Sequence, residues 1–115
     1  MIITITYGEK TYCSYNLTDP ESLARLLEEV PIEEVIIAAQ QFKIGELKKR
    51  ASQAIYAAAP AYKQVNAALG IYDTTTSEAI TAAIQAVRSQ VDEKELEVIS
   101  LDSLEEVLAY EVTFP

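Results

Sequence analysis

Apolar and polar side chains alternate at the start of the chain with the period of a β-strand. From Ile3 to Tyr7 every second residue is apolar and the residues between are threonines, which is the pattern of a half-buried strand. Gly8-Glu9 follows, and glycine at the first central position suits a two-residue II′ turn. Residues 1–17 are therefore predicted to form a β-hairpin.

The return strand, Thr11–Leu17, places Cys13, Tyr15 and Leu17 on one face. A two-stranded hairpin is marginal in water, so it must pack against helices, gain a third strand or join another chain. Residues 111–114 are typical of a terminal strand, which would supply the third strand of such a sheet.

Helical spacing begins after the helix-start motif Thr18-Asp19-Pro20-Glu21. Either Thr18 or Asp19 can cap the helix, proline suits the first turn, and the outer residues of the motif fit a capping box. Apolar residues then recur at i, i+3, i+4 and i+7 up to Val30. Pro31 ends the helix, because the residue before a proline avoids the α region.

Residues 32–42 fit two structures. Their apolar positions have helical spacing, whereas Val35-Ile36-Ile37 is also typical of a short buried strand. The glutamates and glutamines mostly fall outside the apolar stripe, which favours the helix. Lys43-Ile44-Gly45 is predicted to break the secondary structure.

Two helices flank Pro60. The first covers Glu46–Ala59 with an apolar face, and proline either breaks it or opens the next helix. The second covers Ala61–Leu69, and Gly70 stands at the position after the helix end that glycine favours.

A loop rich in hydroxyl side chains precedes the next helix. Any residue from Asp73 to Ser77 could cap this helix, and Thr75 is the best candidate because Glu78 completes a capping box. The helix is expected to end near Val91-Asp92. Asp102-Ser103 is predicted to cap a further short helix.

These elements predict an α+β fold in a single domain, 1–115. A hairpin at 1–17, with or without residues 110–115 as a third strand, packs on an Ala-rich helical bundle formed by 18–109.

Charge and composition narrow the function. The chain has 18 acidic and nine basic residues, a net charge of −9, no histidine and one cysteine. The acidity argues against binding a nucleic-acid backbone. Without histidine the chain lacks the commonest general base and metal ligand, and no phosphate loop, zinc spacing or nucleophile elbow is present. We therefore expect no enzyme activity, no catalytic or metal site and no cofactor.

The segment from Ala51 to Val87 is Ala-rich and carries only three charged residues. Such a helical pair fits either a thin intrachain core or packing between subunits, and both interpretations place the same five residues in apolar contacts: Ile55, Leu69, Ile80, Ile84 and Val87. Tyrosine is enriched at interfaces, and this chain has seven. The candidate partner-binding residues are Tyr12, Tyr56, Tyr62, Lys63, Gln64 and Asn66.

Residues 46–70 combine a basic helix start at Lys48–Arg50, an Ile-x4-Pro step at Ile55–Pro60, and the unit Tyr62-Lys-Gln-x-Asn66. In these features they resemble a helical element of small tailed-bacteriophage proteins. With the following Ala-rich helix, the resemblance covers residues 46–90. It implies a protein associated with tail fibres, baseplates or fibre assembly.

The function expected is thus that of a non-enzymatic bacteriophage structural or tail-assembly protein that acts through protein–protein contacts. Its partners would be other phage structural proteins or copies of itself, in a homo- or hetero-oligomer. No signal peptide or membrane span is found in the sequence, so we expect a soluble protein made in the host cytoplasm and associated with the virion. The alternatives are a small acidic regulator or DNA-mimic inhibitor that binds a basic partner, and a host adaptor domain.

Overall fold

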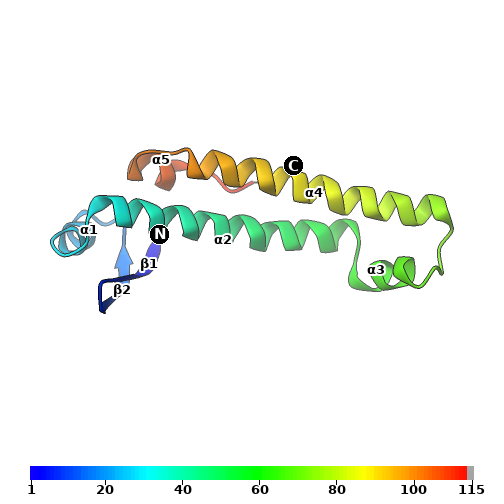
Figure 1. The fold of residues 1–115 in the computed structure, drawn as a ribbon, viewed down its shortest axis with the longest axis horizontal. Coiled ribbons are helices and arrows are strands. Elements are labelled where there is room, and N and C mark those ends of the chain that lie inside the picture. Colours follow the sequence, from blue (N-terminus) through cyan, green and yellow to red (C-terminus); the bar gives the residue numbers. More distant parts are fainter. Residues whose placement is uncertain (114–115) are drawn as a thin grey trace. The chain divides into compact units, whose positions relative to one another are not determined.

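The computed structural model describes residues 1–113, and it has an α+β fold (Figure 1). Two strands are followed by five helices. Backbone contacts divide the chain into two compact units. Met1–Gly45 with Glu97–Glu111 is called the hairpin unit here, and Glu46–Leu96 with the chain from Val112 onward is called the Ala-rich unit.

The predicted N-terminal hairpin is confirmed. Strands β1 (Ile2–Tyr7) and β2 (Lys10–Asn16) are antiparallel. Gly8 joins them at φ +64°, and glycine is the residue that takes this conformation without steric cost. Ile3 and Ile5 of β1 are buried.

A β-bulge in β2 changes the face predicted for Cys13. Ile3 pairs with Tyr15 and Ile5 pairs with Tyr12, so two residues of β2 oppose one residue of β1. The extra residue turns the backbone at Ser14, whose φ is +59°. Tyr12 and Tyr15 therefore both pack against the core, while Cys13 is exposed. The prediction that Cys13 shares the face of Tyr15 is wrong, because strict alternation fails across a bulge.

Helix α1 (Pro20–Leu27) starts as the sequence predicts. Of the two possible caps, Asp19 is the one that accepts a hydrogen bond from the Glu21 amide, at 3.3 Å. Ser22 and Leu26 face inward, and the Ser22 hydroxyl accepts the Asn16 amide at 2.9 Å. This bond ties the helix to the end of β2. The core of the hairpin unit consists of Ile3, Ile5, Leu17, Leu26, Val30, Val35, Ala39, Leu104 and Val107.

Helix α2 (Ile32–Ala58) includes both the ambiguous residues 32–42 and the break predicted at Lys43-Ile44-Gly45. Residues 32–42 are helical, as favoured from the sequence, but the helix continues through Gly45. An exposed glycine in a helix costs only about 1 kcal/mol. Ile44 and Leu47 are buried on either side of it, and burying such side chains offsets that cost.

Helix α4 (Thr74–Ile99) differs from its prediction at both ends. Its cap is Asp73, whose carboxylate accepts the Thr76 amide at 2.7 Å, so Thr75 lies inside the first turn. It also runs past Val91-Asp92. The Gln40 side-chain amide lies 3.0–3.4 Å from three carbonyl oxygens near residues 98–101, which satisfies backbone groups at the far end of the helix.

Helix α5 (Leu104–Ala109) begins at the predicted Ser103 cap, which accepts the Glu106 amide at 3.2 Å. The predicted third strand is not found in residues 111–113, and the described sheet has two strands. The rest of that predicted strand, from Phe114, lies outside the described residues. The hairpin instead packs against helices, the first of the three possibilities for its stabilisation. Within residues 1–113, no helix is long and apolar enough to cross a membrane.

Candidate protein-interaction surface

Helix α3 (Ala61–Ala68) forms the corner of the Ala-rich unit. It connects the end of α2 to the loop before α4 (Figure 1). Pro60 stands at its N-cap with φ −51° and ψ 154°, so the chain is extended there and α2 cannot continue. The predicted proline break is therefore confirmed.

The end of α3 has a Schellman motif. Gly70, at φ +71°, donates its amide to the Ala67 carbonyl at 3.2 Å, and Ile71 donates to the Asn66 carbonyl at 3.0 Å. These two bonds satisfy carbonyls that a helix end otherwise leaves unpaired. The position predicted for Gly70 is thus confirmed, and the motif holds Ile71 close to the last turn of the helix.

The polar residues of α3 lie on its inner side. Lys63, Gln64 and Asn66 are half-buried. The Gln64 side-chain amide donates to the Ala59 carbonyl at 2.6 Å, and the Asn66 side-chain amide donates to the Tyr72 hydroxyl at 3.2 Å. These bonds fix the corner and the following loop, so both amides already have partners within the chain.

The apolar residues of α3 lie on its outer side. Tyr62, Val65 and Leu69 are 61%, 55% and 70% exposed, and Ile71 beyond the helix is 63% exposed. Their spacing in the helix is i, i+3 and i+7, which places them on one face. We use "outer face" for the exposed apolar residues Ala61, Tyr62, Val65, Ala68, Leu69 and Ile71. The helix has no fully buried residue, and its amphipathic pattern is inverted relative to a surface helix of a globular protein.

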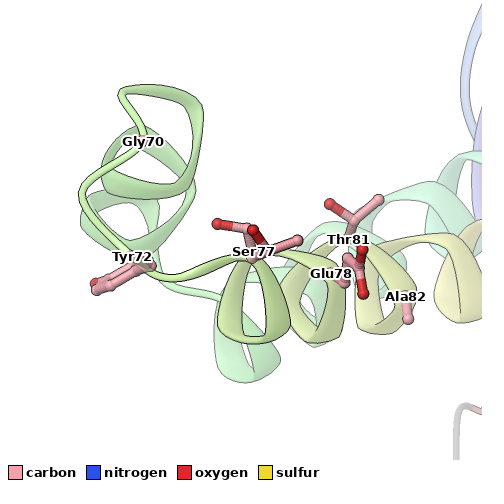
Figure 2. A pocket seen from close by; sticks show the side chains of 7 residues that line it. Gly70, Tyr72, Ser77, Glu78, Thr81 and Ala82 are labelled. Atoms are coloured by element: carbon pink, nitrogen blue, oxygen red, sulfur yellow. The ribbon is translucent and has the colours of Figure 1, made fainter.

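Two open grooves flank the loop after α3, and Tyr72 lines both. In the larger one Figure 2 shows Ser77, Glu78 and Thr81 along α4, with Tyr72 on the loop. Its volume is about 600 Å³, and the lining is Gly70, Tyr72, Thr74, Ser77, Glu78, Thr81 and Ala82. The smaller has a volume of about 410 Å³ and is lined by Ala58, Lys63, Tyr72, Thr76, Ala79, Ile80 and Ala83. Glu78 and Lys63 are the charged residues among these linings.

The structure groups five of the six predicted contact residues. Tyr56, Tyr62, Lys63, Gln64 and Asn66 all belong to the Ala-rich unit. Of these, Tyr56 and Tyr62 are more than half exposed, whereas the other three are half-buried. The two tyrosines are therefore the members of this group with most surface available to a partner.

Tyr12 belongs to the hairpin unit and is held by a polar network. Its hydroxyl donates to the Glu29 carboxylate at 2.7 Å, and the Lys10 ammonium lies 3.4 Å from the same oxygen. The bond to Glu29 raises the pKa of the Tyr12 phenol. The same bond, followed by those from Lys10, lowers the pKa of the Glu29 carboxyl. This geometry gives Tyr12 a structural role in joining β2 to the chain after α1.

Sequence reasoning omitted Val65, Leu69 and Ile71 as contact residues. The signal was present, because Tyr62, Val65 and Leu69 have the spacing of one helix face. Leu69 was assigned to apolar contacts that the chain itself does not supply, since 70% of the residue is exposed.

Charge is unevenly divided between the two units. The hairpin unit contains twelve acidic and three basic residues, and the Ala-rich unit contains six of each. The whole net charge of −9 therefore belongs to the hairpin unit, and the Ala-rich unit is neutral. In the latter, Lys48–Arg50 lies inside the continuous helix α2, so the helix start predicted there is wrong. Lys48 lies 3.7 Å from the Glu95 carboxylate, which partly neutralises this basic cluster.

Within residues 1–113, no group of three or more cysteine, aspartate or glutamate side chains is placed to hold a metal ion. No protein-family model, curated protein or solved structure matches the chain. The outer face of α3 is the candidate site that the structure supports best, as a surface for protein contact, because its large apolar residues are exposed.

Proposed function

We propose that this chain is a non-enzymatic assembly protein of a tailed bacteriophage, associated with its tail fibre or baseplate, and that it acts through protein–protein contacts. The observation that carries the contact role is the outer face of α3. A short helix that turns its polar residues inward and Tyr62, Val65 and Leu69 outward loses the hydrophobic stabilisation that burial would give. A partner restores it.

The phage assignment rests on the resemblance of residues 46–70, and the structure suggests why that pattern would recur. The Ile55–Pro60 step coincides with the corner between α2 and α3. In the unit that follows, Gln64 and Asn66 hydrogen-bond within the chain, while Tyr62 points outward as an exposed side chain. The polar residues of the motif would thus build the corner, and its tyrosine would contact the partner.

The test is quantitative peptide mass spectrometry on purified virus particles and on infected-cell lysate from the source. Several copies of the chain in each particle would support a structural role. A chain that is absent from particles but bound to tail proteins in the lysate would support an assembly role. A chain found in neither would refute the proposal.

A second candidate function is that of an acidic regulator that binds a basic protein. The specific observation in its favour is the net charge of −9 confined to the hairpin unit. Clustered carboxylates steer basic partners and make binding strongly salt-dependent. Its test is binding to a DNA-binding protein over a salt series, with Glu33→Gln/Glu34→Gln and Glu105→Gln/Glu106→Gln as charge-neutralised variants. Affinity that changes neither with salt nor with these variants would refute it.

A further inference from the structure

We propose that the partner of the outer face is a second copy of this chain, so that α3 of one copy packs against α3 of the other around a two-fold axis. This inference rests on the proposed role in assembly and names one contact within it. The same patch then faces itself, as in the symmetric interfaces that are commonest among soluble oligomers.

The first argument is the area available. Four large apolar residues of the outer face are more than half exposed, and two exposed alanines lie beside them. Burying this set removes roughly 500 Å² from each copy, or roughly 1,000 Å² in the pair, which reaches the lower limit for a specific interface. Two copies of the outer face alone therefore provide enough surface for a weak but specific dimer.

The second argument is charge. A second copy carries a net charge of −9, all of it in the hairpin unit, so the hairpin units of two copies repel each other. The outer face has no charged residue, and between Ala51 and Val87 the chain has only Lys63, Asp73 and Glu78. Lys63 is half-buried on the inner side of α3. The outer face is thus a place where two copies meet without placing like charges opposite each other.

The third argument is the arrangement of large and small side chains. Ala61 and Ala68 are exposed beside Tyr62, Val65 and Leu69. The distance between two packed helices depends on the side chains at the contact, and alanines let the helices approach closely. In a two-fold pairing, the alanines of one copy leave space for the large side chains of the other.

The test compares matched variants by sedimentation equilibrium of the full chain. Leu69→Gln removes an apolar side chain from the outer face, and Leu96→Gln makes the same change at an equally exposed position on α4 (70% and 69% exposed). Tyr62→Gln and Tyr56→Gln form a second pair, at 61% and 56% exposure. Circular dichroism verifies that each variant keeps its helix content.

We expect the wild-type chain to form a dimer. Leu69→Gln or Tyr62→Gln should raise its dissociation constant by about 100-fold, because each substitution removes the side chain from both halves of the interface. The two control variants should keep the wild-type constant.

Two results would overturn the inference. One is a wild-type chain that stays monomeric at its highest attainable concentration. The other is a dimer that Leu69→Gln and Tyr62→Gln leave unchanged, which would place the interface elsewhere. Neither result decides the proposed function, because an assembly protein can use the outer face for a different partner. That proposal stands or falls with the particle and lysate measurement.

Discussion

Gly45 offers a direct test of the long helix α2. The sequence predicts a break at this residue, whereas the structure places it inside a continuous helix from Ile32 to Ala58. Replacing Gly45 with alanine distinguishes the two. A break would use the freedom of glycine, so alanine would disturb it. A continuous helix gains from alanine, because glycine loses more backbone entropy on folding.

The size of the gain follows from the surroundings of Gly45. It is exposed, and an added Cβ would meet no atom within 4 Å. No packing term opposes the substitution, so Gly45→Ala should contribute the full difference in helix propensity, about 0.8–1.0 kcal/mol. For a chain of this length that corresponds to a rise of about 4 °C in the melting temperature. Thermal unfolding followed by circular dichroism at one fixed protein concentration measures it.

Gly70→Ala is the matched control for this substitution. An added Cβ at Gly70 also meets no atom within 4 Å, but the residue has φ +71°. Alanine in the left-handed region costs about 1–2 kcal/mol. Alanine also lowers the conformational entropy of the unfolded chain, which offsets part of this cost, so the free energy of unfolding should fall by about 1 kcal/mol. Gly45→Ala should therefore raise the melting temperature, and Gly70→Ala should lower it. A Gly45→Ala variant that melts below wild type would refute the continuous helix.

Three further substitutions test caps and one ionisable group. Gln40→Ala should lower the free energy of unfolding by about 1–2 kcal/mol in urea titrations, because the carbonyls that accept its amide would lose their donor. Asp73→Ala should lower the melting temperature at neutral pH. Since hydrogen bonds from the first turn of α4 lower the pKa of Asp73, that difference should shrink as the pH falls below 3.8 and through the lowered value. Burial and, second, the hydrogen bond to Glu97 raise the pKa of Tyr110 to about 12. This tyrosine therefore stabilises the fold below pH 10 and loses that contribution between pH 10 and 12. Tyr110→Phe should reduce the pH dependence of unfolding in that window, and an unchanged profile would contradict this reasoning.

The helix starts were predictable where local chemistry determines them. Asp19 was one of two proposed caps, and Ser103 belonged to the proposed cap pair. Gly70 occupies the expected position after α3. Each depends on hydrogen bonds within a few residues, so a short stretch of sequence is sufficient.

The lengths of α2 and α4 were not predictable in the same way, because distant residues stabilise them. The Lys43 ammonium, at a predicted break, donates to the Tyr110 carbonyl at 2.7 Å. The Gln40 side-chain amide likewise donates to the Val98 and Ile99 carbonyls at the end of α4. These partners lie about 60 residues away in the sequence. A local pattern therefore indicates the helix but not the contacts that prolong it.

The contact residues show a different limit of sequence reasoning. Periodicity groups the residues of α3 correctly into two faces, one with Lys63, Gln64 and Asn66 and one with Tyr62, Val65 and Leu69. It does not say which face the chain itself covers, and the usual expectation turns the apolar face inward. Here Gln64 and Asn66 find acceptors in the corner that Pro60 creates, so the polar face turns inward. Burying a polar group without its hydrogen bonds costs more free energy than leaving an apolar side chain exposed to water. The inversion of α3 leaves Tyr62, Val65 and Leu69 exposed, and this exposure is the observation on which the proposed contact surface rests.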